Sequence, residues 1–225
     1  MKEINVTVNG RQLTGREGMT ILELCRANGI DIPTLCYIEG LPPSGSCRLC
    51  VVEVEGSRTL VGSCHTPITP GTVIRTDSPK VIETRRMIVE LMLASHPDSC
   101  VICDKANQCE LRKIAADLDI GLTRVHTKKR YYPVEDISPY LIRDMSKCVL
   151  CRRCVRACSE IAKKNILAVG YRGFQSKIIV DTDKPIAKEA CKDCNACVDV
   201  CPTGALSKPG KQGKEPLCKL QFIKG

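Results

Sequence analysis

Two short segments repeat one cysteine spacing, and this repeat limits the possible folds more than any other feature of the sequence. Residues 148–158 (CVLCRRCVRAC) and 191–201 (CKDCNACVDVC) both follow the pattern C-x2-C-x2-C-x3-C. This spacing is typical of chains that bind two [4Fe-4S] clusters, in which three cysteines of one segment bind one cluster and its fourth cysteine binds the other. Zinc, the alternative, is normally bound by CxxC pairs that close at four ligands, which fits two even quartets poorly.

The crossed arrangement of the repeat predicts two sets of ligands. The first [4Fe-4S] set is Cys148, Cys151, Cys154 and Cys201, and the second is Cys158, Cys191, Cys194 and Cys197. Pro202 follows the last cysteine of the repeat, as the usual pattern requires, whereas Ser159 stands at the matching place in the first copy. Between the two copies, residues 166–173 and 177–183 flank a turn and predict a β-hairpin.

A third group of cysteines lies near the N-terminus. Its members are Cys36, Cys47, Cys50 and Cys64. One ligand before a CxxC pair and one well after it is the grouping of a plant-type [2Fe-2S] loop, although the first gap is ten residues instead of four. Small residues at 42–46 (PPSGS) would let backbone N–H groups approach the cluster sulfurs. A zinc ribbon is the alternative for this group.

The segment 96–109 (HPDSCVICDKANQC) contains three cysteines, which cannot close a [4Fe-4S] cluster by themselves. Because imidazole is a competent iron ligand, we expect a fourth cluster bound by one histidine and three cysteines. The expected ligands are His96, Cys100, Cys103 and Cys109. In the alternative, His96 faces water and His65, Asp104 or solvent fills the fourth position.

These assignments use nearly all of the cysteine. Fifteen of the 17 cysteines and one histidine would hold one [2Fe-2S] and three [4Fe-4S] clusters. Cys25, inside an expected helix, is interpreted as a small buried hydrophobe, and Cys218 stands alone. The formal charge of +9 would fall to about +2 once four anionic clusters are bound. Scattered Lys and Arg and only 3% aromatic residues argue against a nucleic-acid partner.

The rest of the sequence predicts an α+β chain. Strands at 4–8 and 11–14, a helix at 20–27, an irregular stretch at 31–48 and a strand at 49–56 together suggest a β-grasp module. A helix should follow Asp77-Ser78-Pro79, with its apolar side chains at Ile82, Ile88, Leu91, Met92 and Ala94. A second helix should run from 110 to 120, and the basic run at 128–130 should be solvated.

We therefore expect five regions. They are a [2Fe-2S] β-grasp domain at 1–78, a small helical domain with a His-ligated [4Fe-4S] cluster at 79–121, a linker at 122–138, a bacterial two-[4Fe-4S] ferredoxin-like domain at 139–208 and a C-terminal tail at 209–225. No run approaches the roughly 18 apolar residues of a membrane span. Dense cysteine without a secretory segment favours metal binding in a reducing, cytoplasmic compartment.

The sequence offers no catalytic site. It contains no G-x-G-x-x-G or Walker loop, and no nucleophile–base pair or carboxylate dyad stands out. Clusters whose iron positions are all taken by protein ligands have no open site for a substrate, so they can only pass single electrons. The chain is therefore expected to be non-catalytic alone and to depend on other subunits.

The order of these motifs resembles a known family. It is similar to the N-terminal part of the large iron–sulfur subunit of respiratory complex I and of multi-cluster [FeFe]-hydrogenases, and most similar to the electron-transfer (diaphorase gamma) subunit of NAD-linked hydrogenases and formate dehydrogenases. The segments that carry the resemblance are PTLCYIEG (33–40), SCRLCVVEVEG (46–56), RRMIVELML (85–93), HPDSCVICDKANQCEL (96–111), CVLCRRCVRAC (148–158) and CVDVCPTGAL (197–206).

The resemblance implies a place in a larger complex. It implies a flavin-containing subunit that oxidises NAD(P)H on one side, and a terminal hydrogenase or formate dehydrogenase subunit, in some cases electron-bifurcating, on the other. A soluble ferredoxin is a further implied partner. The alternatives are a free-standing multi-cluster carrier, a zinc-stapled interaction protein, and a sensor that responds through a labile cluster.

Overall fold

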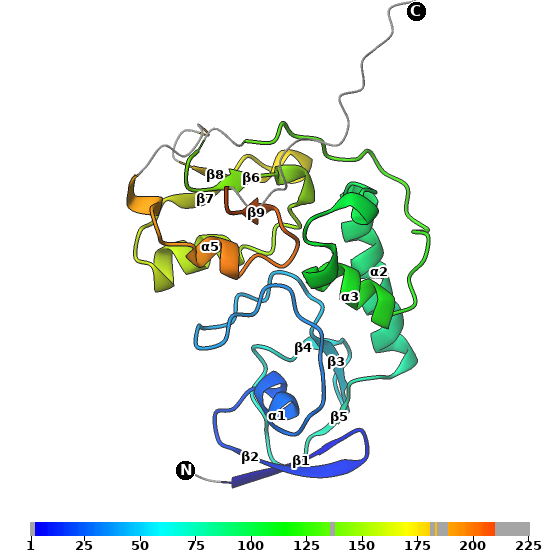
Figure 1. Ribbon diagram of the computed structural model, residues 1–225. Coiled ribbons are helices and arrows are strands. Elements are labelled where there is room, and N and C mark those ends of the chain that lie inside the picture. The colour runs from blue at the N-terminus through cyan, green and yellow to red at the C-terminus, as the bar shows by residue number, and fades with distance from the viewer. Residues whose placement is uncertain (1–2, 136–137, 181–182, 184–188, 210–225) are drawn as a thin grey trace, which may run out of the picture.

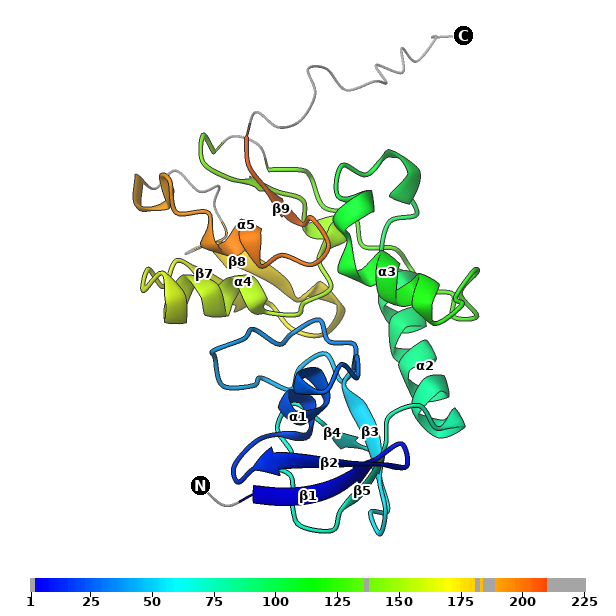
Figure 2. The same cartoon turned by 60° about the horizontal axis from the view of Figure 1, so that its bottom comes forward.

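The computed structural model describes residues 3–135, 138–180, 183 and 189–209. The N-terminal sheet lies at one end of the molecule, the two longer helices form one side, and the duplicated cysteine segment lies at the other end (Figure 1). The irregular stretch after the first helix lies between the sheet and the duplicated segment, and Figure 2 shows the same order. The C-terminal residues from 210 and Cys218 lie outside the described residues.

The N-terminal part is a mixed five-stranded sheet in the order β2-β1-β5-β3-β4. β1 (Glu3–Val8) and β2 (Arg11–Arg16) form the predicted hairpin, in which Asn9 and Gly10 both have positive φ, at 49° and 77°, as a tight primed turn requires. β3 (Val51–Val54) is shorter than the expected strand. β4 (Val61–Gly62) and β5 (Val73–Arg75) were not predicted, and β5 pairs in parallel with β1.

A short helix packs on this sheet and completes its core. α1 (Ile21–Ala27) begins at Thr20, whose hydroxyl accepts a hydrogen bond from the Glu23 amide, while the Glu23 carboxylate accepts one from the Thr20 amide. α1 lies over β1 and β2 (Figure 2). Cys25 is completely buried in this core among aliphatic side chains, which confirms the interpretation of Cys25 as a buried hydrophobe.

The long helix α2 (Pro79–Ser95) begins as predicted, because the Ser78 hydroxyl accepts a hydrogen bond from the Val81 amide and Pro79 occupies the first turn. Most of its predicted apolar face packs inward: Ala94 is buried, and Ile82, Ile88 and Met92 pack against the core, whereas Leu91 is 52% exposed. The buried face also includes Arg85, whose guanidinium donates to the carbonyl oxygens of Leu49 at 3.1 Å and Val51 at 2.8 Å. Apolar spacing alone did not predict this buried, hydrogen-bonded arginine.

Two short turns and a second helix follow α2. Tight turns span η1 (Cys100–Ile102) and η2 (Ala106–Gln108), and α3 (Glu110–Asp117) begins directly after Cys109. α3 ends before the expected residue 120, and Asp119 adopts a left-handed conformation, with φ at 52°. The α2 and α3 helices pack against each other on the side of the molecule (Figure 1).

The segment that follows α3 is held against the rest of the chain. Lys129 Nζ donates to the Leu93 carbonyl at 3.2 Å and to the Asp98 carboxylate at 2.8 Å. Arg130 Nη2 donates to the Cys148 carbonyl at 2.9 Å. The prediction of a solvated basic run is therefore wrong for Lys129 and Arg130, because their partners lie far away in sequence.

The C-terminal part is built from two small antiparallel ladders and two one-turn helices. β6 (Ile142–Arg143) pairs with β9 (Leu206–Ser207), and β7 (Leu167–Gly170) pairs with β8 (Lys177–Val180), which confirms the predicted hairpin. The remaining elements are η3 (Met145–Lys147), α4 (Arg153–Arg156), η4 (Ala157–Ile161), η5 (Gly173–Gln175), η6 (Glu189–Cys191) and α5 (Ala196–Asp199). Among the described residues, no helix has the length and apolar character needed to cross a bilayer.

Candidate metal centres

The four N-terminal cysteines come together in the loops at the edge of the five-stranded sheet, and all four are buried. They are Cys36, Cys47, Cys50 and Cys64. They interact in two pairs, because the Cys47 thiol is hydrogen-bonded to Cys36 and the Cys64 thiol to Cys50. In each pair this hydrogen bond lowers the pKa of the accepting thiol below its usual range and raises the pKa of the donor. The two pairs also interact with each other through charge.

The loop around these cysteines supplies polar hydrogens to sulfur. The Ser44 hydroxyl donates to Cys36 and the Ser46 hydroxyl lies beside it, and both lower the pKa of the Cys36 thiol. The Leu35 amide lies 3.4 Å from Cys47 Sγ. The small residues of 42–46 thus contribute through their hydroxyls as well as through the close approach that the sequence suggested.

One histidine and three cysteines from the segment that joins α2 and α3 line a small pocket, together with Lys147 and Thr203 of the C-terminal part. The histidine and the cysteines are His96, Cys100, Cys103 and Cys109. Burial lowers the pKa of His96, so its imidazole is neutral near pH 7. Its Nδ1 lies 3.1 Å from the Pro97 carbonyl oxygen and donates to it, which places the lone pair on Nε2. Nε2 is buried and its geometry makes no hydrogen bond to the described residues, although the Lys147 backbone is close enough to affect the pKa of the imidazole.

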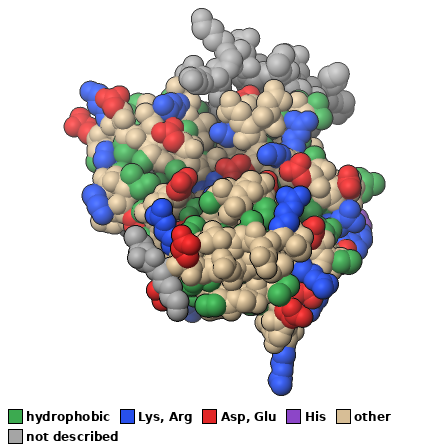
Figure 3. Space-filling view, turned by 90° about the horizontal axis from the view of Figure 1, so that it is seen from below, with side chains coloured by type: hydrophobic (Ala, Val, Ile, Leu, Met, Phe, Trp, Pro, Cys, Tyr) green, Lys and Arg blue, Asp and Glu red, His purple; other side chains and the backbone are tan. Residues whose placement is uncertain are grey.

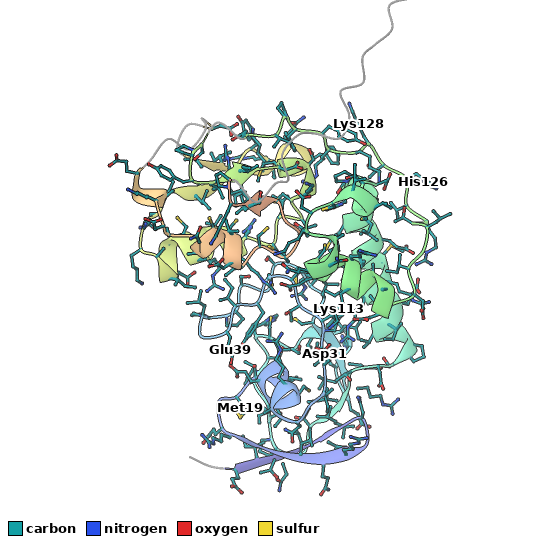
Figure 4. All side chains as sticks on the ribbon, viewed as in Figure 1. Met19, Asp31, Glu39, Lys113, His126 and Lys128 are labelled. Atoms are coloured by element: carbon teal, nitrogen blue, oxygen red, sulfur yellow. The ribbon has the colours of Figure 1, made fainter. Side chains whose placement is uncertain are left out.

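An orphaned imidazole nitrogen in a pocket of three thiols is the donor set that an iron cluster requires. The other histidines lie elsewhere: His65 Nδ1 is 3.6 Å from Cys64 Sγ, and His126 lies at the outer edge of the chain after α3 (Figure 4). Asp104 lines a neighbouring pocket together with Cys103. Of these side chains, His96 alone lines the pocket with the three cysteines among the described residues.

The duplicated segments form two further groups with crossed membership. One pocket is lined by Cys158, Cys191, Cys194 and Cys197. The thiols of the other group, which interact through charge, belong to Cys148, Cys151, Cys154 and Cys201. The duplication is also visible in the backbone, because equivalent residues of the two copies adopt left-handed conformations. These are Leu150 and Arg152 in the first copy, and Asp193 and Asn195 in the second.

Without a bound metal, burial makes these thiols weak acids. It raises the pKa of Cys148 to about 11 and that of Cys151 and Cys197 to about 12. Metal binding requires thiolates, so a metal held by these residues would have to compensate for this desolvation. Main-chain amides assist, since the Leu150 amide lies 3.4 Å from Cys148 Sγ and the Ile166 amide lies 3.3 Å from Cys158 Sγ. Among the described residues, no three His, Cys, Asp or Glu side chains converge on a position for a single metal ion.

Positive and negative side chains are mixed on one face of the molecule. Figure 3 shows Lys and Arg side chains interspersed with Asp and Glu on the face seen from below. The described ion pairs agree with this, since Arg124 pairs with Glu83 and Glu90, and Arg156 with Glu160. This face therefore has no continuous basic patch of the kind that follows a nucleic-acid backbone.

Three family models match the chain in sequence order. Residues 1–79 match the 2Fe-2S iron-sulfur cluster binding domain, and residues 85–124 match the NADH-ubiquinone oxidoreductase-G iron-sulfur binding region. Residues 138–207 match the ferredoxin-like domain of NADH-quinone oxidoreductase subunit 3. The chain thus consists of a 2Fe-2S ferredoxin-like domain followed by 4Fe-4S binding regions, which confirms the expected fold class.

Known proteins with similar sequences include hydrogenase and complex I subunits. The chain is 40% identical over 211 residues to the NADP-reducing hydrogenase subunit HndD of Solidesulfovibrio fructosivorans, covering 92% of this chain and 36% of that protein. It is 36% identical over 207 residues to the mitochondrial NADH dehydrogenase [ubiquinone] iron-sulfur protein 1 of Solanum tuberosum, covering 92% and 28%. The chain thus spans about a third of the length of these relatives.

A solved structure resembles the chain over most of its length. It is the crystal structure of an NAD+-reducing [NiFe]-hydrogenase in the H2-reduced state, which superposes with a TM-score of 0.83 at 28% identity. The match covers 95% of this chain and 90% of that chain. These likenesses confirm the resemblance to complex I and hydrogenase iron–sulfur subunits that the motif order predicted.

Proposed function

We propose that this chain, a relative of the iron–sulfur subunits of complex I and of NAD(P)-linked hydrogenases, relays single electrons between two partner subunits. One partner contains flavin and oxidises NAD(P)H, and the other is a terminal hydrogenase or formate dehydrogenase, in some complexes electron-bifurcating. The observation that supports this proposal is that one buried histidine and three cysteines line one pocket, while four cysteines of the duplicated segments line another. The dense cysteine also supports a reducing, cytoplasmic location.

We further propose the cofactors and their ligands. One [2Fe-2S] cluster would be held by Cys36, Cys47, Cys50 and Cys64. Three [4Fe-4S] clusters would be held by His96, Cys100, Cys103 and Cys109, by Cys148, Cys151, Cys154 and Cys201, and by Cys158, Cys191, Cys194 and Cys197. The corresponding regions would be 1–78, 79–121 and 139–208, with a linker at 122–138 and a tail at 209–225.

When bound, such clusters supply one-electron redox chemistry. The protein holds them through four side chains each, so no position remains for a substrate, and buried surroundings such as those of Cys36 and Cys64 exclude water. Amides and serine hydroxyls donate to the sulfurs and stabilise the negative charge of the reduced state. The chain itself has no catalytic residue in this proposal.

Iron analysis of anaerobically prepared protein tests the cofactor content. The expected value is about 14 irons per chain, the number that one [2Fe-2S] and three [4Fe-4S] clusters require. A colourless preparation that contains zinc would instead support the zinc-stapled interaction protein. An iron content well below this value would contradict the proposal.

The role of His96 can be tested against a matched control. His96→Ala should lose the fourth ligand of one cluster, so the iron content should fall by about four per chain. His126→Ala, which removes a peripheral histidine (Figure 4), should leave it unchanged. Equal iron content in the two variants would refute the assignment of His96 as a ligand.

His96→Cys tests whether residue 96 is a cluster ligand, because the substitution changes the charge of the ligand set. Replacing a neutral imidazole by a thiolate adds a negative charge to the site, which should lower the reduction potential of that cluster alone. A redox titration followed by electron paramagnetic resonance (EPR) spectroscopy measures this potential. An unchanged or higher potential would contradict the expected effect.

Purification of the native complex distinguishes a fixed subunit from a free carrier. A fixed subunit should elute from gel filtration together with a flavin-containing chain and with a nickel, molybdenum, tungsten or [FeFe] enzyme, and the metal found would name the reaction. Elution alone, near the chain mass of 24.7 kDa, would favour the free-standing carrier.

A further inference from the structure

One buried arginine lies where three of the four cysteine groups meet. Arg153 is the first residue of α4 and is only 9% exposed. Its Nη1 donates to the Glu110 carboxylate at 2.6 Å, and its Nη2 donates to the Thr34 carbonyl oxygen at 3.4 Å. These two partners come from segments 43 and 119 residues away. The guanidinium thus joins three separate parts of the chain.

Each of these three parts carries a proposed cluster ligand beside the contact. Arg153 itself stands between Cys151 and Cys154, Glu110 directly follows Cys109, and Thr34 lies two residues before Cys36. The contact therefore connects the [2Fe-2S] site, the His-ligated site and one ferredoxin-like site.

The surrounding packing makes the same connection. Cys36, Cys47 and Cys151 belong to one continuous buried cluster, against which Cys109 packs. Ser46, beside Cys47, donates through its hydroxyl to the Cys151 carbonyl at 3.4 Å. The three sites consequently share one apolar interior, and Arg153 is a charged group at its edge.

One further contact links the His-ligated site to the ferredoxin-like site. The Glu110 amide donates to the Pro202 carbonyl at 2.9 Å, next to Cys201. Glu110 thus contacts the ferredoxin-like part through its main chain as well as through its side chain.

Stability alone explains this arginine poorly. Its Nε is buried and has no hydrogen-bond partner among the described residues, and Glu110 is 45% exposed on its side chain. A buried guanidinium with an unpaired donor carries a desolvation penalty that an ion pair with a half-exposed carboxylate offsets only partly. The planar guanidinium of arginine can, however, donate hydrogen bonds to two partners at once in two fixed directions.

We propose that Arg153 is a positioning residue that fixes the [2Fe-2S], His-ligated and ferredoxin-like cluster sites relative to one another. This inference rests on the proposed electron-transfer function and its ligand sets. Because one guanidinium binds both Glu110 and Thr34, Arg153 keeps the three ligand-bearing segments at fixed distances from one another. Electron exchange between the cluster sites depends on these distances, because the rate of tunnelling falls steeply as the distance between clusters increases.

The test compares Arg153→Lys with Arg156→Lys in the full-length, cluster-loaded chain. Lysine at 153 keeps the charge but is a single point donor, so it cannot hold both partners in the directions of the fork. Arg156 is the matched control, because it lies on the same helix and pairs with Glu160 only four residues away. The readouts are iron content, the EPR spin–spin interaction between reduced clusters, and the rate at which electrons equilibrate among the clusters after rapid reduction.

The expected result separates geometry from cluster content. Arg153→Lys should retain the wild-type iron content, show weaker spin–spin interaction and equilibrate several-fold more slowly, whereas Arg156→Lys should match the wild type in all three readouts. Arg153→Lys with wild-type iron, coupling and rate would overturn the inference. Loss of one cluster with unchanged coupling among the others would also overturn it, since the role would then be local.

A second variant keeps the test decisive if Arg153→Lys does not fold. Glu110→Gln retains a hydrogen-bond acceptor at a half-exposed position but removes the charge that draws the guanidinium, so it should weaken the coupling in the same direction at full iron content. Unchanged coupling in Glu110→Gln would overturn the inference. Wild-type protein without the four clusters would instead refute the proposed function, which is a separate result.

Discussion

The close approach between the His-ligated loop and the duplicated segment depends on the absence of a side chain at Gly204. Gly204 follows Cys201 by three residues and has φ at +70°, and a methyl group at this position would lie 2.6 Å from Lys105 Cβ. Ordinary contact between carbon atoms begins at about 3.5 Å, and Lys105 Cβ cannot rotate away because it is attached directly to the backbone. Gly204→Ala therefore requires the two loops to separate.

The cost of this substitution has two parts. Alanine in a left-handed conformation costs roughly 1–2 kcal/mol, and the overpacking of the two loops costs roughly 1–3 kcal/mol more. Gly173→Ala is the matched control, because Gly173 also has positive φ, at +58°, but no described atom beyond its chain neighbours lies within 4 Å of the added methyl group. We expect Gly204→Ala to be less stable than Gly173→Ala by about 1–3 kcal/mol, which is the overpacking part alone.

Guanidinium unfolding of the two variants, followed by visible absorbance of the clusters under anaerobic conditions, measures this difference. Gly204→Ala should have the lower midpoint. The cluster proposed at His96 should also be lost before the [2Fe-2S] cluster proposed for the N-terminal part, since Lys105 lies between Cys103 and Cys109. Equal midpoints for the two variants would refute the close-contact argument.

Three further changes probe the N-terminal part, each by the same unfolding measurement. Thr20→Ala removes the hydroxyl that caps α1 and should lower stability by about 0.5–2 kcal/mol; an unchanged midpoint would contradict the capping role. Cys25→Ser should lower the free energy of unfolding by roughly 1–3 kcal/mol, because a hydroxyl then lies in an apolar core. The iron content should not change. A loss of iron would mean that Cys25 is a ligand. Arg85→Met removes two hydrogen bonds to the carbonyls of Leu49 and Val51, each worth about 1.5–3 kcal/mol. This variant should therefore release the proposed [2Fe-2S] cluster at a lower denaturant concentration than the wild type. Release at the wild-type concentration would show that these hydrogen bonds do not support the cluster loop.

The features that the sequence predicted correctly are those decided by neighbouring residues. The first hairpin depends on Asn9 and Gly10, which accept positive φ, and the starts of α1 and α2 depend on the capping hydroxyls of Thr20 and Ser78. The backbone turns within each copy of the duplicated segment are likewise local, because residues between the cysteines, such as Leu150, adopt left-handed conformations there.

The features that the sequence missed depend on distant partners. β5 contains only three residues, and its place between β1 and β3 is set by pairing with residues about 20 and 65 positions away. In the sequence, Lys129 and Arg130 are typical of a solvated basic run, because their hydrogen-bond partners, the carbonyls of Leu93 and Cys148, are distant in the chain. The three-way contact of Arg153 could not be read from its motif, since no local pattern indicates that its partners flank two other sites.

The pairing of β6 with β9 has a consequence for the ancestry of such chains. Residues 142–143 and 206–207 are antiparallel neighbours, so the polypeptide enters and leaves the duplicated unit at nearly the same point. A unit with adjacent entry and exit can be cut out of one gene and spliced into another without stretching the host backbone. The β6–β9 ladder therefore brings the two ends of this part of the chain together.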